Sequence, residues 1–323
     1  MSITAFKEKV SQLIESKVPF VFIIDFEMKN PLAYTLEEFE ERGFLFDIKG
    51  KTNSTKKTKR PSDVLLNVKP IAKEKYLMAF SEVQRNINKG NSFLLNLTFP
   101  SEIKTDASLE EIFHLSRAPY KLFRRNKFVV YSPECFVKIE DDYIYSYPMK
   151  GTIDVSVPNA EYELMNSEKE TREHNTIVDL IRNDLSMVAS EVSVTKFRYV
   201  EKIKSHQNEI LQTSSEIRGK LQEGWEENFC DILFKLLPAG SISGAPKQKT
   251  LEIINGVEIK DRGFYTGVFG IFDGKNVDSG VSIRFIEKEN NKFWYRSGGG
   301  ITALSNAEEE YQELIDKIHV PTI

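Results

Sequence analysis

Cysteine is scarce in this sequence, and long apolar runs are missing from it. The 323 residues include two cysteines, Cys135 and Cys230, which lie far apart along the chain. Two such residues provide neither a disulfide framework nor a paired-cysteine metal site. We expect both to be core thiols, and we expect a chain of this kind in a reducing, cytoplasmic compartment.

The sequence also lacks the marks of secreted, membrane and nucleic-acid-binding proteins. It contains no stretch near the roughly 20 apolar residues that a membrane-spanning helix needs. Lys7, Glu8 and Lys9 interrupt the apolar residues near the start, so we expect no secretion signal. The 44 basic residues are outnumbered by 48 acidic ones, which leaves no bulk positive field for a nucleic acid. A small-molecule substrate is therefore expected.

The residues that are present predict a mixed fold with one core. Hydrophobic residues make up 40% of the chain, which is enough for a sizeable core. The sequence contains no internal repeat and no clean linker. We therefore predict one α+β domain over residues 1–323, in which a short N-terminal portion, 1–70, precedes a core over 72–323.

Apolar periodicity locates the expected elements. Helices are predicted at residues 72–88, 167–185, 225–236 and 246–255, and a further helix closes the chain. Strands are predicted at residues 19–26, 92–99, 265–272, 280–287 and 292–297, with several antiparallel strands between 127 and 152. Residues 50–60 contain no apolar side chain, and we expect a mobile surface loop there.

Two predicted helices each carry a pair of glutamates on one face. Glu170 and Glu173 are three residues apart, and so are Glu310 and Glu313, with Lys317 one turn further on. Such a pair on its own is ordinary for a solvated helix surface. Two pairs together favour a hard cation, and Mg²⁺ prefers carboxylate oxygens. We predict Glu173 and Glu313 as direct ligands, with Glu170 and Glu310 outside them.

Two glycine-rich segments accompany these helices. Gly298, Gly299 and Gly300 precede a capping-box pattern at Ser305 and Glu308, which predicts a helix N-terminus. Free backbone amides there would bind a carboxylate, although a flexible turn is the alternative. The second segment, residues 238–247, places Pro246 at a first helical position and Gly256 beyond the helix end. Turn chemistry leaves its Ser241, Ser243 and Lys247 unexplained.

These segments, taken in order, resemble the chorismate-utilising enzymes. The motifs are SPE at 132–134, PMKGT at 148–152, KETREH and VDLIRNDL in the long helix, PAGSISGAPK, GFYTGVFGIFD, SIRF, SGGGIT and EEEYQE. The resemblance covers residues 96–317. It implies two large, mostly antiparallel sheets packed face to face with helices outside, and a substrate pocket at one edge.

The resemblance also assigns roles to single residues. It implies that Glu134 is a general acid, that Arg284 and Tyr265 hold one substrate carboxylate, and that Gly298–Gly300 help to hold the other. Ser243, Lys317, Asn96 and Thr152 are placed at the substrate as well.

Lys150 decides which member of the group the chain is similar to. Anthranilate synthases typically have alanine at this position, and the hydrolytic members keep a lysine where this chain has Asn96. The combination of Asn96 and Lys150 resembles the members that convert chorismate and ammonia to 4-amino-4-deoxychorismate. Lys150 would then add to ring carbon C2 as a neutral amine, which requires burial to lower its pKa.

The resemblance implies a partner and leaves alternatives. Neither cysteine lies in a nucleophile turn, so a separate glutamine amidotransferase subunit is expected to supply the ammonia. The short N-terminal portion predicts no regulatory tryptophan site. Gln212 replaces a histidine that is common in the family, and His174 is expected to be a packing residue. The alternatives are an anthranilate synthase component, an isochorismate or salicylate synthase, and a non-catalytic activator of the amidotransferase.

Overall fold

Antiparallel strands form two large sheets in the computed structural model, which describes residues 1–55, 64–204 and 209–322. Among these residues each sheet has nine strands. Sheet A contains β1 (Phe20–Ile24), β2 (Leu32–Thr35), β9 (Cys135–Glu140), β10 (Tyr143–Ser146), β11 (Met149–Asp154), β12 (Ser190–Lys204), β13 (Glu209–Lys220), β15 (Val268–Phe272) and β16 (Val277–Val281). Sheet B contains β3 (Phe44–Ile48), β4 (Lys51–Thr52), β5 (Leu66–Lys69), β6 (Leu94–Thr105), β7 (Tyr120–Arg124), β8 (Phe128–Ser132), β14 (Gly244–Ala245), β17 (Phe285–Glu289) and β18 (Lys292–Ile301).

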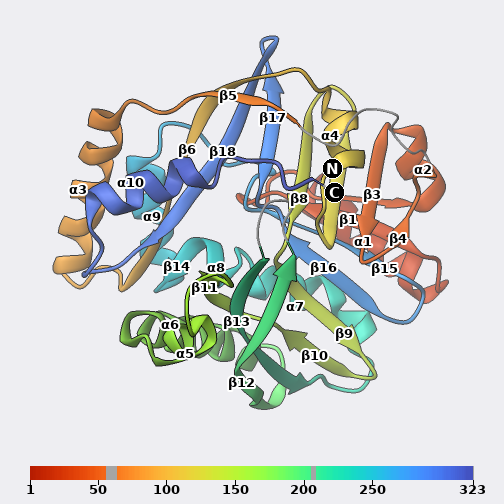
Figure 1. The fold of residues 1–323 in the computed structure, drawn as a ribbon. Coiled ribbons are helices and arrows are strands. Elements are labelled where there is room, and N and C mark those ends of the chain that lie inside the picture. Colours follow the sequence, from red (N-terminus) through yellow and green to blue (C-terminus); the bar gives the residue numbers. More distant parts are fainter. Residues whose placement is uncertain (56–63, 205–208, 323) are drawn as a thin grey trace.

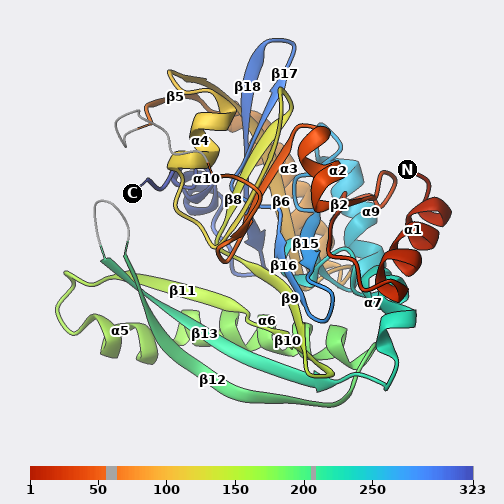
Figure 2. The same cartoon turned by 90° about the vertical axis from the view of Figure 1, so that its right-hand side faces the viewer.

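Apolar residues of the two sheets share a buried cluster. Val21 and Ile23 of β1 lie in the same cluster as Phe44 and Phe46 of β3 and Phe285 of β17. Figure 2 shows β10–β13 of sheet A at the bottom of the view and β17 and β18 of sheet B at the top. The predicted fold class, α+β with two large antiparallel sheets and helices outside, is confirmed.

Helices cover the outer faces of the sheets (Figure 1). α3 (Lys73–Asn88) contacts β6, and α10 (Ala307–Asp316) contacts β18. α6 (Glu168–Ser186) contacts β11, β12 and β13. The remaining helical segments are α1 (Ile3–Glu15), α2 (Leu36–Glu41), α4 (Leu109–Leu115), α5 (Ala160–Asn166), η1 (Trp225–Asn228), α7 (Phe229–Leu236), α8 (Gly240–Ser243) and α9 (Lys247–Val257). No helix in these described ranges is long and apolar enough to cross a membrane.

Two short connections carry the chain from one sheet to the other. Residues 133–134 join β8 of sheet B to β9 of sheet A, and residues 282–284 join β16 of sheet A to β17 of sheet B. Each connection accepts a hydrogen bond from a strand that borders the other connection. The amide of Val281 in β16 donates to the carbonyl of Glu134 at 3.0 Å, and the amide of Tyr131 in β8 donates to the carbonyl of Arg284 at 3.2 Å. Glu134 and Arg284 are thereby fixed at the sheet junction.

The structure corrects several predicted boundaries. The strand predicted at 280–287 is two strands, because the chain changes sheets at 282–284. The strand predicted at 92–99 continues to Thr105 in β6, and Gly256 lies inside α9 rather than beyond it. In the predicted loop at 50–60, Lys51–Thr52 form β4, whereas residues 56–60 lie outside the described residues. Both cysteines are buried and free, as predicted.

Candidate active site

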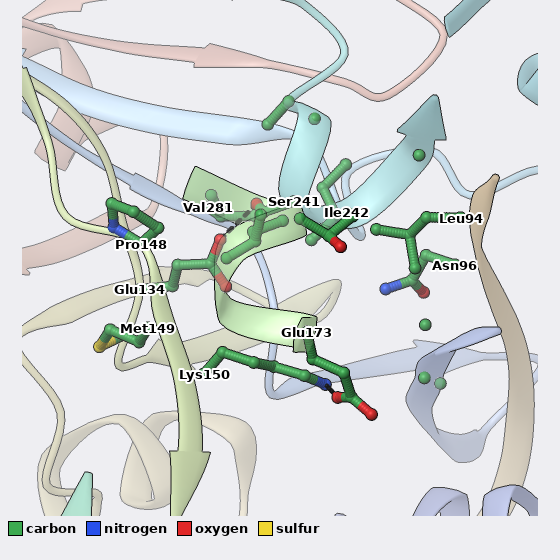
Figure 3. Close-up of a pocket in the computed structure, with 18 of the residues that line it drawn as sticks. Leu94, Asn96, Glu134, Pro148, Met149, Lys150, Glu173, Ser241, Ile242 and Val281 are labelled. Atoms are coloured by element: carbon green, nitrogen blue, oxygen red, sulfur yellow. Dashed lines mark hydrogen bonds and ion pairs between the residues drawn. The ribbon is translucent and has the colours of Figure 1, made fainter. Parts of the chain in front are cut away.

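A pocket of about 970 Å³ lies between the two helices that carry the glutamate pairs. Its walls come from β6, β11 and β18 and from helices α6, α8 and α10. Figure 3 shows Glu134, Lys150, Glu173 and Asn96 arranged around it. Segments that are more than 200 residues apart in sequence thus meet in one cavity, since Asn96 and Lys317 both line it.

Glu134 reaches the pocket from the junction between β8 and β9. The hydroxyl of Ser241 donates a short hydrogen bond to its Oε1 atom. Burial raises the pKa of Glu134, and this effect outweighs the opposite effects of Ser241, Lys317 and Arg284. The direction is the one predicted for a general acid, because a raised pKa keeps the carboxyl group protonated nearer to neutral pH.

Lys150 lies at an irregularity of β11, where the register with β13 shifts between Met149 and Thr152. Its Nζ atom is 2.8 Å from Oε2 of Glu173, and the hydroxyl of Thr213 donates to its backbone carbonyl. The side chain is 39% exposed. Burial lowers the pKa of Lys150, but the surrounding carboxylates, Glu173 first, raise it above its ordinary value. The predicted neutral amine is therefore wrong for this arrangement, because burial does not outweigh the ion pair.

Glu173 of α6 and both Glu310 and Glu313 of α10 line the pocket, whereas Glu170 lies outside the lining residues. Burial, and then the neighbouring Glu173, raise the pKa of Glu170. Burial also raises the pKa of Glu310, with Glu313 adding to the effect. Burial would raise the pKa of Glu313, but Lys317 at 2.6 Å, with Lys150 and Lys169, outweighs burial and lowers it. Each pair is close enough to the other to act on it, since Glu313 contributes to the raised pKa of Glu170.

This donor set fits a hard cation in charge and in chemistry. Glu173, Glu310 and Glu313 line the pocket with Lys150 and Lys317. Glu170 lies outside the lining residues but near enough to act on them, so these four carboxylates and two lysines form a cluster with an excess of negative charge. The lysines now occupy one oxygen each of Glu173 and Glu313. Over the residues that the structure describes, no three metal-binding side chains are already gathered around one point. Mg²⁺ would therefore have to displace these lysine contacts.

Glycine lets backbone and carboxylate approach closely on both sides. Gly151 has a φ of +90°, and a Cβ atom built on it would lie 2.8 Å from Oε2 of Glu170. A Cβ on Gly299 would lie 3.1 Å from Oε2 of Glu310 and 3.7 Å from Oε1 of Glu313. A side chain at either position would compete with the acidic cluster for space.

The triple-glycine segment is a strand and not a loop before a helix. Gly298, Gly299 and Gly300 belong to β18 and pair with Thr98, Leu97 and Asn96 of β6. β17 pairs with β18 only as far as Arg296, so the far edge of the glycine segment faces the pocket without a neighbouring strand in the described structure. Helix α10 begins at Ala307 with Asn306 as its N-cap, which corrects the cap predicted at Ser305.

Arg284 and Tyr265 line the same pocket, as the resemblance implied. Tyr265 is 4% exposed, and the guanidinium carbon of Arg296 lies 5.3 Å from the centroid of its ring. Arg284 has a φ of +52° at the point where the chain enters β17. Strain of this kind is retained where the surrounding structure fixes a residue in place.

The remaining predicted residues divide into two groups. Asn96 and Lys317 line the pocket, and Lys317 donates to the carbonyl of Gly298 at 2.8 Å. Ser243 does not line it: its hydroxyl is fully buried and donates to the carbonyl of Ala239. Thr152 is exposed and lies outside the lining residues, after the irregularity in β11 at which the register with β13 shifts between Met149 and Thr152.

Two further residues lie behind the pocket wall. His174 is fully buried, its Nε2 atom is 2.7 Å from the hydroxyl of Ser215, and its ring contacts Phe197 edge to face. The prediction of a packing histidine is confirmed. Gln212 pairs with Thr152 and Glu201 in sheet A and is not a lining residue.

A family model described as "chorismate binding enzyme" matches residues 21–322 of this sequence. The chain belongs to the chorismate-binding enzyme family. The match covers every pocket segment named above, from β6 to α10.

Relatives of this chorismate-binding enzyme carry several names. A protein of Pasteurella multocida named "Uncharacterized PabA-like protein" is 53% identical over 322 residues, which is 99% of each chain. Aminodeoxychorismate synthase component 1 of Salmonella typhimurium is 33% identical over 256 residues, covering 74% of this chain and 55% of that protein. The crystal structure of anthranilate synthase component I from Streptococcus pneumoniae has a TM-score of 0.66 and 27% identity, covering 78% of this chain and 58% of that one. The chain thus spans little more than half of the latter two proteins.

Sequence reasoning missed three charged residues that organise the pocket of this chorismate-binding enzyme. Arg296 is 2% exposed and lines the pocket beside Tyr265. Arg262 pairs with Glu258 and donates to the carbonyls of Asn96 at 2.6 Å and Ile242 at 2.8 Å, so it joins two walls. The spacing of Glu258 and Arg262, one helical turn apart in sequence and opposite in charge, was the available signal.

Proposed function

We propose that this chorismate-binding enzyme is an aminodeoxychorismate synthase component I, which converts chorismate and ammonia to 4-amino-4-deoxychorismate for 4-aminobenzoate and folate synthesis. Lys150 is the observation that carries the proposal. Its amine lies in the pocket beside Glu173, and the pocket also contains Glu134, a partly buried carboxyl group with a raised pKa. A nucleophilic amine and a proton donor in one cavity support replacement of a ring hydroxyl.

Chorismate is a dianion, and the pocket has separate groups for its two carboxylates. Arg284 can make two parallel hydrogen bonds to the enolpyruvyl carboxylate, and Tyr265 lines the wall next to it. The free edge of Gly298–Gly300 presents backbone amides for the ring carboxylate. When bound to Glu173 and Glu313, with Glu170 and Glu310 behind them, Mg²⁺ would neutralise the acidic cluster and bind the ring carboxylate.

The chemistry divides into two displacements at the ring. Lys150, released from Glu173 and having given its proton to solvent, adds to C2 while the double bond shifts and the C4 hydroxyl leaves. Glu134 protonates that hydroxyl, which departs as water. Ammonia then attacks C4, the bond between C2 and the lysine nitrogen breaks, and Lys150 leaves as a neutral amine. Glu134 takes the surplus proton from the new amine and returns to its starting state.

The source of ammonia is proposed to be a separate glutamine amidotransferase subunit. Both cysteines of this chain are buried, and burial raises the pKa of each thiol to about 12. A thiol with so high a pKa is a poor nucleophile at neutral pH. Neither residue therefore supports glutamine hydrolysis within this chain.

Product analysis tests the proposal. The purified protein is incubated with chorismate, Mg²⁺ and an ammonium salt near pH 8, and products are separated and weighed by mass spectrometry. We expect 4-amino-4-deoxychorismate without release of pyruvate. Anthranilate with an equal amount of pyruvate would instead identify an anthranilate synthase, and isochorismate or salicylate without ammonia would identify a hydrolytic member.

Covalent trapping adds a second readout. Incubation with chorismate and Mg²⁺ but without ammonia is expected to increase the intact mass by one chorismate less one water, with the adduct on Lys150. The Lys150→Ala variant is the matched control and is expected to form no adduct. A protein that binds chorismate and an amidotransferase but never turns over would be the non-catalytic activator.

A further inference from the structure

Ser241 is the one member of the segment 238–247 whose hydroxyl meets a catalytic group. It donates to Oε1 of Glu134, and Figure 3 shows the second carboxyl oxygen of Glu134 directed away from Ser241. A protonated carboxyl group has one oxygen that accepts and one that carries the proton. The Ser241 hydroxyl therefore marks Oε1 as the acceptor and leaves the proton on Oε2.

Helix α8, which carries Ser241, is held against α6 by a partly buried ion pair. Lys247 is 3.0 Å from Oδ2 of Asp184 on α6 and donates to the carbonyl of Leu236 at 2.7 Å. A Cβ atom on Gly240 would lie 2.8 Å from the same Asp184 oxygen, so the helix backbone rests directly on this pair. Arg262 holds the opposite end through the carbonyl of Ile242.

We propose that Ser241 is a positioning residue for proton transfer, because its hydroxyl selects the oxygen of Glu134 that delivers and recovers the proton. The inference rests on the proposed function, in which Glu134 is the proton donor. The ion pair between Asp184 and Lys247 supports this role by holding α8 against α6. These contacts give a role to Ser241 and Lys247, two of the three side chains that turn chemistry left unexplained.

The proton cycle explains why a hydroxyl is useful at this position. Burial raises the pKa of Glu134, and Ser241 lowers it, as do the charges of Lys317 on α10 and Arg284 at the junction. Cys135, the next residue along the chain, stays neutral because burial raises its pKa to about 12. With Ser241 in place, Glu134 both loses its proton to the departing hydroxyl and accepts one from the new amine. The O–H bond of Ser241 itself neither breaks nor forms in this cycle.

The pH profile of kcat/KM for Ser241→Ala tests this role. Loss of a hydrogen bond to a buried carboxylate is expected to raise the pKa of Glu134 by about one to two units. One limb of the profile should then move to higher pH by that amount, while the other limb stays in place. Ser241→Thr keeps the hydroxyl and should restore the position of the moved limb.

Ser243→Ala is the matched control on the same helix. Its hydroxyl is bonded to the carbonyl of Ala239 and does not contact Glu134, so both limbs should keep their wild-type positions. A Ser241→Ala profile with unmoved limbs, or an equal shift in Ser243→Ala, would overturn the inference.

The wild-type reaction separates this inference from the proposed function. If wild-type protein forms no 4-amino-4-deoxychorismate, the proposed function fails. If wild-type protein forms it and the limbs of Ser241→Ala do not move, the role of Ser241 alone fails. If Ser241→Ala does not fold, Ser241→Thr provides the test. A folded Ser241→Thr variant whose pH profile differs from that of the wild type would contradict the role of the hydroxyl.

Discussion

The pocket walls formed by α6 and α10 each contain a lysine–glutamate ion pair, but the charged groups around the two pairs differ. Lys150 and Glu173 are 2.8 Å apart, and Lys317 and Glu313 are 2.6 Å apart. Burial lowers the pKa of both lysines, but the final directions differ. The pKa of Lys150 is raised because carboxylates of both walls act on it. The pKa of Lys317 is lowered because burial is stronger there and because Arg284 and Lys150 lie near it.

This difference teaches that the neighbours of an ion pair, and not its length, set the protonation state. Lys317 has a second anchor, the carbonyl of Gly298, and so ties α10 to β18. For Lys150, Glu173 is the one side-chain partner within the described ranges. We infer that Lys150 is the lysine whose contact is replaced when the pocket fills, and that Lys317 stays in place as a support.

Removing the two lysines should produce the largest contrast between the walls. Lys150→Ala is expected to lower kcat/KM by about 10³-fold or more, since a covalent nucleophile is lost, with little change in chorismate affinity. Lys317→Ala should cost about 10–100-fold and should act mainly on KM. Steady-state kinetics and calorimetric titration with chorismate measure both effects. A larger loss of kcat in Lys317→Ala would reverse the assignment.

Substituting the glutamates should show that the walls act alike toward Mg²⁺. Glu173→Gln and Glu313→Gln remove one charged ligand each, so we expect Mg²⁺ affinity to fall by about 100-fold or more in both. Glu170→Gln and Glu310→Gln should lose about 10–100-fold, as expected for residues behind the direct ligands. Calorimetric titration with MgCl₂ in the absence of chorismate provides the measurement. If Glu173→Gln or Glu313→Gln left Mg²⁺ affinity unchanged, the wall that carries that glutamate would not contribute a direct ligand.

Alanine substitutions of the glycines beside the acidic pairs should lower the free energy of unfolding by different amounts on the two walls. Gly151→Ala combines a left-handed backbone with a contact to Glu170, and we expect a loss of about 2 kcal/mol in the free energy of unfolding. Gly299→Ala lacks the positive φ, and its added Cβ atom would lie 3.1 Å from the nearest carboxylate oxygen rather than 2.8 Å, so the expected loss is below about 1 kcal/mol. Urea titrations compare them.

Gly90→Ala isolates the backbone part of that effect. Gly90 has a φ of +77°, and a Cβ atom added to it would meet no atom of the described residues within 4 Å. Its loss of about 1 kcal/mol represents the conformation alone. If Gly151→Ala costs no more than Gly90→Ala, the close approach to Glu170 has no energetic weight.

The smallest expected effect is the pH dependence of stabilisation by Mg²⁺. The raised pKa values of Glu170 and Glu310 mean that the folded state holds their protons to higher pH than the unfolded chain. These groups favour the folded state below their unfolded pKa, and this contribution is lost as pH rises through the folded values. Mg²⁺ should therefore raise Tm by about 2–4 °C at pH 8 and by less at pH 5.5. Thermal unfolding with and without MgCl₂ at each pH measures it.

Periodicity and composition predicted the fold well where one face of an element is buried. The helices over residues 72–88 and 167–185 and the strand over residues 19–26 were located to within a few residues, because their apolar spacing is regular. The sheet change at residues 282–284 could not be predicted, since apolar residues alternate through it at Val281, Ile283 and Phe285, and only the tertiary pairing shows the break.

The sequence predicted which residues form the candidate site better than it predicted how those residues contact one another. Spacing identified Glu170, Glu173, Glu310 and Glu313, because the members of each pair share a helix face. It could not show that Lys150 would pair with Glu173, since that contact depends on how β11 meets α6 in space. Ser243 was assigned to the substrate because a pattern of serines does not reveal which one a short helix turns toward the cavity.

The two strand crossings at Glu134 and Arg284 have a mechanical consequence. Because both residues lie where strands pass between the sheets, and because the strands there are hydrogen bonded to one another, a sliding motion of one sheet over the other would carry the two side chains together. Lys150 belongs to sheet A and the triple glycine to sheet B, so the same motion would change the width between them. Sheet sliding would then widen and narrow the cavity while Glu134 and Arg284 keep their positions relative to each other.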